Sequence, residues 1–223
     1  MKTSWITATI ALACLSATGI ASATATHPNV DYIYSTGPGL GLDIPDNDPN
    51  GVSSTISISD DFLISHMAIL VSLDHTWVGD LIFTLTGPDG TSITLADRPG
   101  FTGDGFGDNS NLSMSYPIIF GDLFPQVDAE NLGRACIGTD AVVGADCTRQ
   151  VSANDSMAGA FGGTSTLGDW TLTVSDNANA DTGAINGWSI AIQVPSAVPV
   201  PAGVWLFASG LFALVGARRK RAA

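Results

Sequence analysis

Residues 161–192 read FGGTSTLGDWTLTVSDNANADTGAINGWSIAI, and this stretch decides the fold class. It contains two runs in which large apolar side chains alternate with polar or small ones. The apolar members are Trp170, Leu172 and Val174 in the first run and Trp188, Ile190 and Ile192 in the second. Successive side chains of a β-strand point to opposite faces, so this alternation predicts two strands that each bury one face. The residues between the runs are rich in Asp, Asn and Gly, which is typical of a connecting loop.

The same alternation occurs earlier in the chain. Residues 69–73 place Ile69, Val71 and Leu73 on one face, and residues 81–86 repeat the pattern before a Gly-Pro-Asp-Gly turn at 87–90. No segment between residues 26 and 194 shows a sustained helical stripe of apolar side chains. The sequence therefore predicts one all-β domain over residues 26–194, an antiparallel, jelly-roll-like β-sandwich.

The N-terminus has the features of a secretory signal peptide. Lys2 supplies a positive charge, residues 6–15 form a short apolar run, and small residues in an Ala-x-Ala pattern follow. The apolar run is too short to cross a bilayer as an anchor. We expect residues 1–25 to form a signal-peptide helix that is removed when the chain is exported through the inner membrane.

The C-terminus contains a second apolar segment. Residues 202–217 carry no charge, and four cations, RRKR at 218–221, follow directly. Counted from Val198 to Ala217, the apolar stretch has 20 residues, the length of a short membrane-spanning helix. The basic end would remain cytoplasmic by the positive-inside rule. We expect residues 195–223 to form a tail with a hydrophobic helix that anchors the chain to the membrane, at least transiently.

The tail sequence VPVPAGVWLFASGLFALVGARRKRA resembles a PEP-CTERM sorting signal of the V-P-x-P-A type. The residues that match the recognition motif are Val198, Pro199, Pro201 and Ala202. The resemblance implies processing by an exosortase-like membrane enzyme of a Gram-negative bacterium. It also implies delivery to the cell envelope, the outer surface or the extracellular matrix.

The segment between the two ends is strongly acidic. It holds all 21 acidic residues but only Arg98, Arg134 and Arg149 among the basic ones, which gives a formal charge of −18. Phosphate binding needs clustered cations, so the charge excludes nucleic acid as a partner. Twenty of the 21 acids are Asp, a residue that suits polar turns, the solubility of a surface protein and calcium binding.

Cysteine usage agrees with export. Cys14 falls in the signal peptide, which leaves Cys136 and Cys147 close together in the sequence. In an oxidising compartment we expect these two to form a disulfide. No C-x-x-C spacing indicates a redox or zinc site.

Residues 74–100 and 161–192 resemble the P/Homo B domain, the jelly-roll module that follows the catalytic domain of kexin- and furin-like subtilases. The matching features are His75-Thr76-Trp77, Gly79-Asp80-Leu81, Trp170-x-Leu172, Asp176, Asp181-x-Gly183 and Asn186-Gly187-Trp188. Residues 44–59 also fit the usual start of that domain. Residues 122–158 do not follow the pattern and are interpreted as an insertion.

The sequence provides no support for catalysis. Gly163-Thr164-Ser165 resembles the nucleophile motif of subtilases, but it precedes a strand rather than opening a helix. None of His27, His66 and His75 is followed by glycine in the subtilase manner, and the chain is too short to hold a subtilase catalytic domain as well. We therefore predict that the protein is not an enzyme and has no catalytic residues.

Calcium is the one cofactor that the sequence suggests, because hard cations prefer loops rich in carboxylate and carbonyl oxygens. Three groups qualify: Asp74 with Asp80, Asp104 with Asp108 and Asn109, and Asp176 with Asn179 and Asp181. None has the spacing of an EF-hand. The alternative is that each carboxylate stabilises a turn, which short polar residues do equally well.

Three functional hypotheses follow. The first is an exported, non-catalytic structural or binding module, with a component of the extracellular matrix as partner. The second is an accessory domain that docks on a separate subtilase and is thereby linked to serine-type endopeptidase activity. The third is an enzyme that uses Ser165, which the missing histidine base disfavours.

Overall fold

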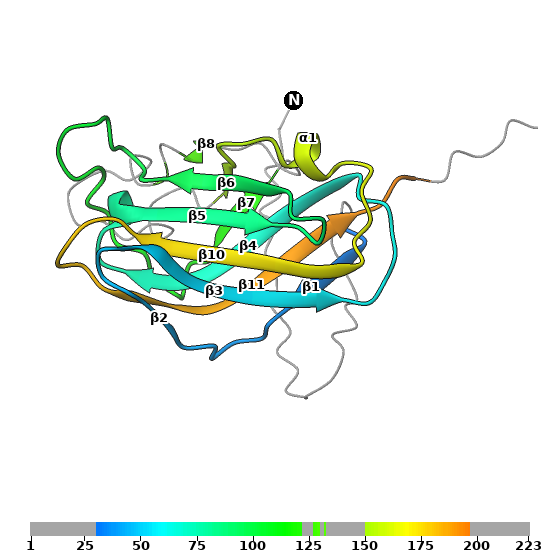
Figure 1. The fold of residues 1–223 in the computed structure, drawn as a ribbon, viewed down its shortest axis with the longest axis horizontal. Coiled ribbons are helices and arrows are strands. Elements are labelled where there is room, and N and C mark those ends of the chain that lie inside the picture. Colours follow the sequence, from blue (N-terminus) through cyan, green and yellow to red (C-terminus); the bar gives the residue numbers. More distant parts are fainter. Residues whose placement is uncertain (1–29, 122–126, 130–131, 133–149, 197–223) are drawn as a thin grey trace, which may run out of the picture.

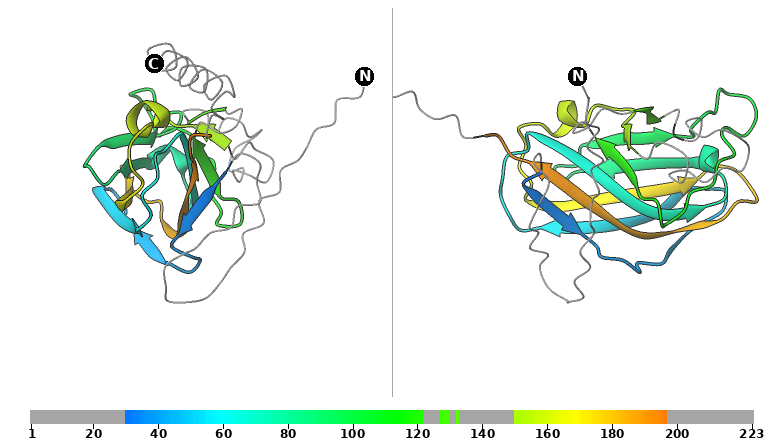
Figure 2. Two further views of the ribbon diagram at one scale, coloured as in Figure 1. Left: turned by 90° about the vertical axis from the view of Figure 1, so that its right-hand side faces the viewer. Right: turned by 180° about the vertical axis from the view of Figure 1, so that it is seen from behind.

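Two β-sheets packed face to face form the fold in a computed structural model that describes residues 30–121, 127–129, 132 and 150–196 (Figure 1). The smaller sheet has the strand order β3–β10–β5–β6, and the larger sheet has the order β1–β11–β4–β7–β9–β8, with β2 also paired to β11. Figure 2 shows the larger sheet from behind, with β11 and β4 crossing the back of the sandwich. The smaller sheet consists of β3 (Asp48–Ile58), β5 (Leu81–Thr86), β6 (Ser92–Asp97) and β10 (Gly168–Asp176).

The larger sheet is built from short edge strands around two long central ones. Its strands are β1 (Tyr32–Ser35), β2 (Leu42–Ile44), β4 (His66–His75), β7 (Ile118–Gly121), β8 (Val127–Asp128), β9 (Gln150–Ser152) and β11 (Gly183–Gln193). Two short helices complete the described part, a 3-10 helix η1 (Val78–Asp80) and α1 (Met157–Phe161). The predicted all-β sandwich is confirmed, as are the strands expected from the alternating runs.

One feature departs from the prediction of a fully antiparallel sandwich. Strand β9 pairs in parallel with both β7 and β8, whereas all other strand pairs are antiparallel in the described residues. A parallel pair needs a crossover of a dozen or more residues. The long segment between Gly121 and Gln150 supplies that length, so the parallel edge arises where the sequence predicted an insertion.

The core lies between the sheets and is filled by the apolar side chains of the alternating runs. Trp170, Leu172 and Val174 of β10 are fully buried, and Trp188 of β11 is 2% exposed. The Trp170 ring packs edge-on against Phe161 with the ring centroids 5.0 Å apart, and its Nε1 donates to the Thr166 carbonyl oxygen at 2.9 Å. The two tryptophans predicted to face the core are therefore both internal.

Several predicted segments lie outside the described residues. They are the signal peptide at 1–25, the Cys136–Cys147 disulfide, and the sorting motif with its apolar run and basic end. Export, disulfide formation and sorting stay predictions.

The prediction of a C-terminal membrane anchor is wrong. A spanning helix needs about 20 residues, whereas the described residues form helices of three and five residues. No helix in the described part of the chain is long and apolar enough to cross a membrane. The apolar run at 202–217 itself lies outside the described residues.

A hydrogen bond from Trp188 links the two sheets through the core. Its Nε1 donates to Ser54 Oγ of β3 at 2.9 Å, and Ser54 is 8% exposed. We expect Ser54→Ala to lower the free energy of unfolding by about 1–3 kcal/mol, because the buried indole N–H loses its acceptor. Urea denaturation measures the change.

The matched control is the neighbouring Ser53, which points to solvent from the same strand. Ser53→Ala should change the free energy of unfolding by less than about 0.5 kcal/mol. Equal effects of the two substitutions would contradict the role of Ser54 as an acceptor between the sheets.

Candidate functional site

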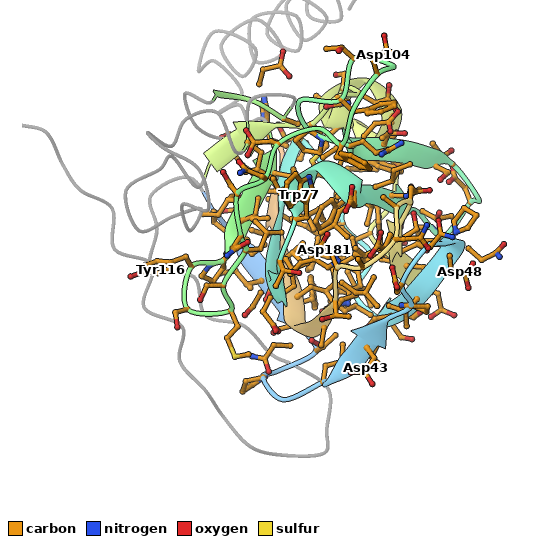
Figure 3. All side chains as sticks on the ribbon, turned by 90° about the vertical axis from the view of Figure 1, so that its left-hand side faces the viewer. Asp43, Asp48, Trp77, Asp104, Tyr116 and Asp181 are labelled. Atoms are coloured by element: carbon orange, nitrogen blue, oxygen red, sulfur yellow. The ribbon has the colours of Figure 1, made fainter. Side chains whose placement is uncertain are left out.

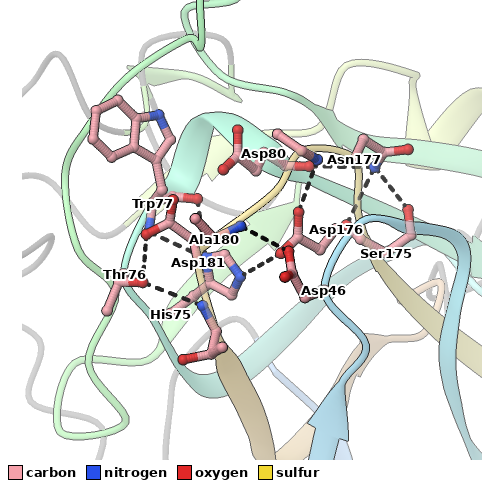
Figure 4. Close-up of polar contacts among 12 residues, drawn as sticks. Asp46, His75, Thr76, Trp77, Asp80, Ser175, Asp176, Asn177, Ala180 and Asp181 are labelled. Atoms are coloured by element: carbon pink, nitrogen blue, oxygen red, sulfur yellow. Dashed lines mark hydrogen bonds and ion pairs between the residues drawn. The ribbon is translucent and has the colours of Figure 1, made fainter.

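One end of the sandwich gathers loop residues from three parts of the chain. Here β4 ends at His75, η1 leads into β5, and β10 ends at Asp176 before the loop to β11. Figure 3 looks onto this end, with the carboxylates of Asp43, Asp48 and Asp181 spread around it. We call this region the acidic end, defined by Asp46, His75, Asp80, Asp176 and Asp181 (Figure 4).

A buried histidine–aspartate pair joins the two sheets at the acidic end. His75 Nε2 lies 3.2 Å from Asp176 Oδ2, and both side chains are inaccessible to solvent. On the other side of the ring, His75 Nδ1 lies 3.1 Å from the Trp77 backbone nitrogen and 3.0 Å from the Trp77 carbonyl oxygen. The pair therefore ties the end of β4 in one sheet to the end of β10 in the other.

Asp80 is the least satisfied polar group of the acidic end. Its side chain is 2% exposed, and its Oδ1 makes no hydrogen bond with any described residue. The nearest cation is Arg98, whose Nη2 lies 3.9 Å from that oxygen, beyond hydrogen-bonding distance. Burial, together with the negative charges of Asp176 and Asp181, raises the pKa of Asp80 to about 7, and the positive charge of Arg98 opposes the rise.

Arg98 is itself held in place by its surroundings. Its guanidinium lies 3.8 Å from the centroid of the Phe101 ring, and its Nε donates to the Gly79 carbonyl oxygen at 3.3 Å. Arg98 also has a positive φ of 46°, an unusual conformation for a residue other than glycine. It is the single Arg or Lys among the described residues, so the acidic end has only this one strong cation within that part of the chain.

The other carboxylates of the acidic end stabilise loops. Asp176 Oδ1 accepts the Ala178 N–H at 3.0 Å, Asp181 Oδ1 accepts the Thr76 hydroxyl at 2.7 Å, and Asp46 Oδ1 accepts the Ala180 N–H at 3.0 Å (Figure 4). These bonds are the turn contacts that short acidic side chains commonly make. They hold the loop between β10 and β11 against the ends of β2 and β4.

The structure regroups the residues of the predicted calcium sites. Asp80 and Asp176 influence one another electrostatically, although the sequence had placed them in different groups. Asp74 lies within β4 opposite Ala184. Asp104 is exposed in the loop after β6, and Asp108 accepts the Ser110 N–H at 2.9 Å.

These positions do not assemble a set of ligands. In the described residues no three His, Cys, Asp or Glu side chains come together in a way that could hold a metal ion. Calcium prefers six to eight oxygens, and the orphaned oxygen of Asp80 provides one. Calcium binding stays a prediction. An unchanged melting temperature between millimolar calcium and chelator would contradict it.

Ser165 lies at the opposite end of the sandwich. Its Oγ donates to Asp61 Oδ1 at 2.6 Å and accepts the Leu167 N–H at 3.0 Å. The two described histidines are engaged elsewhere, since His66 bonds to Ser65 and His75 to Asp176. Ser165 therefore fixes the turn that precedes β10.

A cavity of about 260 Å³ lies beside Ser165. Pro88, Phe161, Leu167 and Trp170 provide its apolar walls, and Asp89 lies at its rim. Asp89 already accepts the backbone N–H and the hydroxyl of Thr91, and these bonds lower the pKa of its carboxyl. Among the described residues that line this cavity there is no histidine.

Sequence reasoning missed two relationships at the acidic end. It did not find Asp176 as the partner of His75, and it did not connect Arg98 with Asp80. His75 ends the run that starts near residue 66, and Asp176 ends the Trp170 run. Each residue can be placed at the end of its strand from the sequence, but the sequence does not show which strand ends meet.

Residues 64–117 and 143–192 match the family model of the proprotein convertase P-domain, which confirms the resemblance over those two segments. They contain the central strands β4, β5, β10 and β11 and most of the acidic end. No curated protein sequence matches the chain.

Two solved structures are similar to this chain. One is the complex of the Aeromonas sobria serine protease with its chaperone, at 20% identity over 77% of this chain and 28% of that chain, with a TM-score of 0.43. The other is the serine protease of Aeromonas sobria, at 19% identity over 76% of this chain and 28% of that chain, with a TM-score of 0.42. The match thus covers only 28% of the length of each of these protease chains.

The raised pKa of Asp80 predicts a pH-dependent stability. The folded state holds a proton between about pH 4 and about pH 7 that the unfolded state has lost, so the free energy of unfolding falls as the pH rises through this window. The Asp80→Asn variant has no titrating side chain at position 80. Relative to the variant, the wild type should lose up to about 4 kcal/mol across the window, as measured by denaturation at several pH values.

The control is Asp104→Asn, because Asp104 is exposed in a loop. This variant should keep the wild-type slope. Parallel pH profiles for wild type and Asp80→Asn would show that Asp80 titrates normally and would contradict its assignment as a destabilised buried acid.

Proposed function

We propose that this protein is an exported, non-catalytic P-domain protein that acts as a structural or binding module outside the cytoplasm. The observation that carries the proposal is the match of residues 64–117 and 143–192 to the proprotein convertase P-domain. The matched segments include the buried β10 and β11 strands and their connecting loop. The sequence features of a signal peptide support export.

The hydrogen bonds of Ser165 support the proposal that this serine is not a catalytic nucleophile. A serine nucleophile needs a base within hydrogen-bonding reach that takes its proton. Ser165 instead donates to Asp61, an exposed carboxylate, while its Oγ also accepts a backbone N–H that fixes a turn. This arrangement suits a structural serine.

A second candidate is an accessory domain that docks on a separate subtilase. The family description favours it, because the matched domain is named for proprotein convertases. Co-elution of the secreted protein with an active-site-labelled subtilase from its own secretome tests this role. Recovery of the protein free of any labelled protease would count against it.

Sorting is part of the leading proposal. The stretch from Val198 to Ala202 is proposed as the element that an exosortase-like enzyme recognises. The intact mass of the protein recovered from cells reports cleavage at either end and the state of Cys136 and Cys147 together. A mass equal to that of the full sequence would contradict both processing events.

The non-catalytic assignment predicts no hydrolysis. The purified full-length protein should cleave casein and fluorogenic peptides no faster than a buffer blank, and Ser165→Ala should behave identically. Thermal melting of both proteins controls for folding. Hydrolysis by the wild type that disappears in Ser165→Ala would contradict the proposal.

A further inference from the structure

The outer face of the smaller sheet carries hydroxyl side chains at every position of two adjacent rows. The strand register aligns one row as Thr55, Thr171, Thr86 and Ser92 and the other as Ser53, Thr173, Thr84 and Thr94. We call these eight residues the hydroxyl face. It faces the viewer in Figure 1, where no described helix or strand lies in front of the sheet.

Strand alternation explains why these side chains point outward. Between the two rows of hydroxyls, Leu172 of β10 and Leu85 of β5 point inward and are fully buried. The eight hydroxyl residues are exposed or half-buried. In a twisted sheet the rows are about 6.8 Å apart along a strand and the strands about 4.8 Å apart, so the hydroxyls form a regular two-dimensional array.

Hydrogen bonds within the array orient several of its members. Ser53 and Thr173 hydroxyls lie 2.8 Å apart, Thr55 and Thr171 hydroxyls 2.9 Å, and Thr86 and Ser92 hydroxyls 3.1 Å. A hydroxyl offers one donor and two acceptor positions, so each member of such a pair retains hydrogen-bonding capacity toward solvent. Threonine is also restricted at χ1, which lowers the entropy lost when a partner binds.

The hydroxyl face is uncharged in a chain whose formal net charge is −13. Carboxylates stand at its borders, with Asp169 bonded to Ser57 at 2.6 Å and Asp97 opposite Ile82. An anionic polymer would be repelled by this surrounding charge. Protein interfaces draw most of their binding energy from Trp, Tyr and Arg side chains, and the hydroxyl face contains none of these residues. The face therefore fits a neutral partner that presents many hydroxyl groups.

We propose that the hydroxyl face binds a neutral polysaccharide whose chains are ordered side by side, an inference that rests on the proposed role as a binding module. One hydroxyl–hydroxyl bond gains little over the bonds that both groups make with water. Two rows of pre-oriented hydroxyls can engage a repeating surface at many points at once, and the summed contacts give useful affinity. An ordered surface matches this requirement because its own hydroxyls repeat at fixed intervals.

The test measures binding of the full-length protein to microcrystalline cellulose by sedimentation, at physiological salt. The variant Thr171→Val/Thr173→Val removes two hydroxyls from the central strand β10 while keeping the β-branched shape. We expect wild type to bind and the variant to bind at least about tenfold more weakly. The matched control Thr102→Val/Ser115→Ala changes exposed loop residues and should bind as wild type does.

A second variant, Thr84→Val/Thr86→Val on β5, gives an independent result if the first variant fails to fold, and thermal melting identifies that case. Failure of wild type to bind cellulose, or equal binding by wild type and both variants, would overturn the proposal. Binding only to an anionic polygalacturonate gel, or only to ice crystals, would overturn it as well. If the folded protein neither hydrolyses substrates nor binds cellulose, the polysaccharide proposal fails, but the proposed function as a non-catalytic module stands. Hydrolysis that depends on Ser165 would instead contradict the proposed function.

Discussion

The register of strand β10 determines most of this structure. β10 pairs with β3 on one side and with β5 on the other, so Thr171 stands between Thr55 and Thr86. This register buries Trp170 and its neighbours inside, and it presents the threonines outside. A slip of one residue would exchange the two faces and place the hydroxyls in the core. The same register brings the end of β10 to the end of β4, where Asp176 meets His75.

The two ends of the sandwich use acidic residues differently. At the acidic end, Asp176 holds a buried histidine while Asp80 remains buried beside a distant arginine. At the opposite end, Asp61 and Asp89 accept bonds from nearby hydroxyls and backbone groups in exposed turns. The strong acidity of the chain thus serves loop structure at both ends, and it leaves the hydroxyl face as a neutral region between them.

The sequence predicted the core well because burial leaves a local signal. The alternation around Trp170 and Trp188 identified two long strands and their inward faces, and the structure confirms both. Contacts between distant strands have no such signal. The pairing of His75 with Asp176 and the parallel edge at β9 depend on which strands are neighbours. The calcium groups were formed from residues close in sequence, whereas the fold brings Asp80 near Asp176 from another loop. The repeats Thr84-Leu-Thr86 and Thr171-Leu-Thr173 are visible in the sequence, but their alignment into rows depends on the register.

The central claim is that this domain is a non-catalytic module that binds through its hydroxyl face. The most direct test is methyl saturation-transfer NMR of the protein with a suspension of cellulose nanocrystals, which present ordered chains. The account predicts that the methyl signals of Thr55, Thr84, Thr86, Thr171 and Thr173 are attenuated most, while those of Thr102 and Thr182 are attenuated least. Attenuation strongest at Leu167 beside the cavity, or equal attenuation at all threonines, would contradict it.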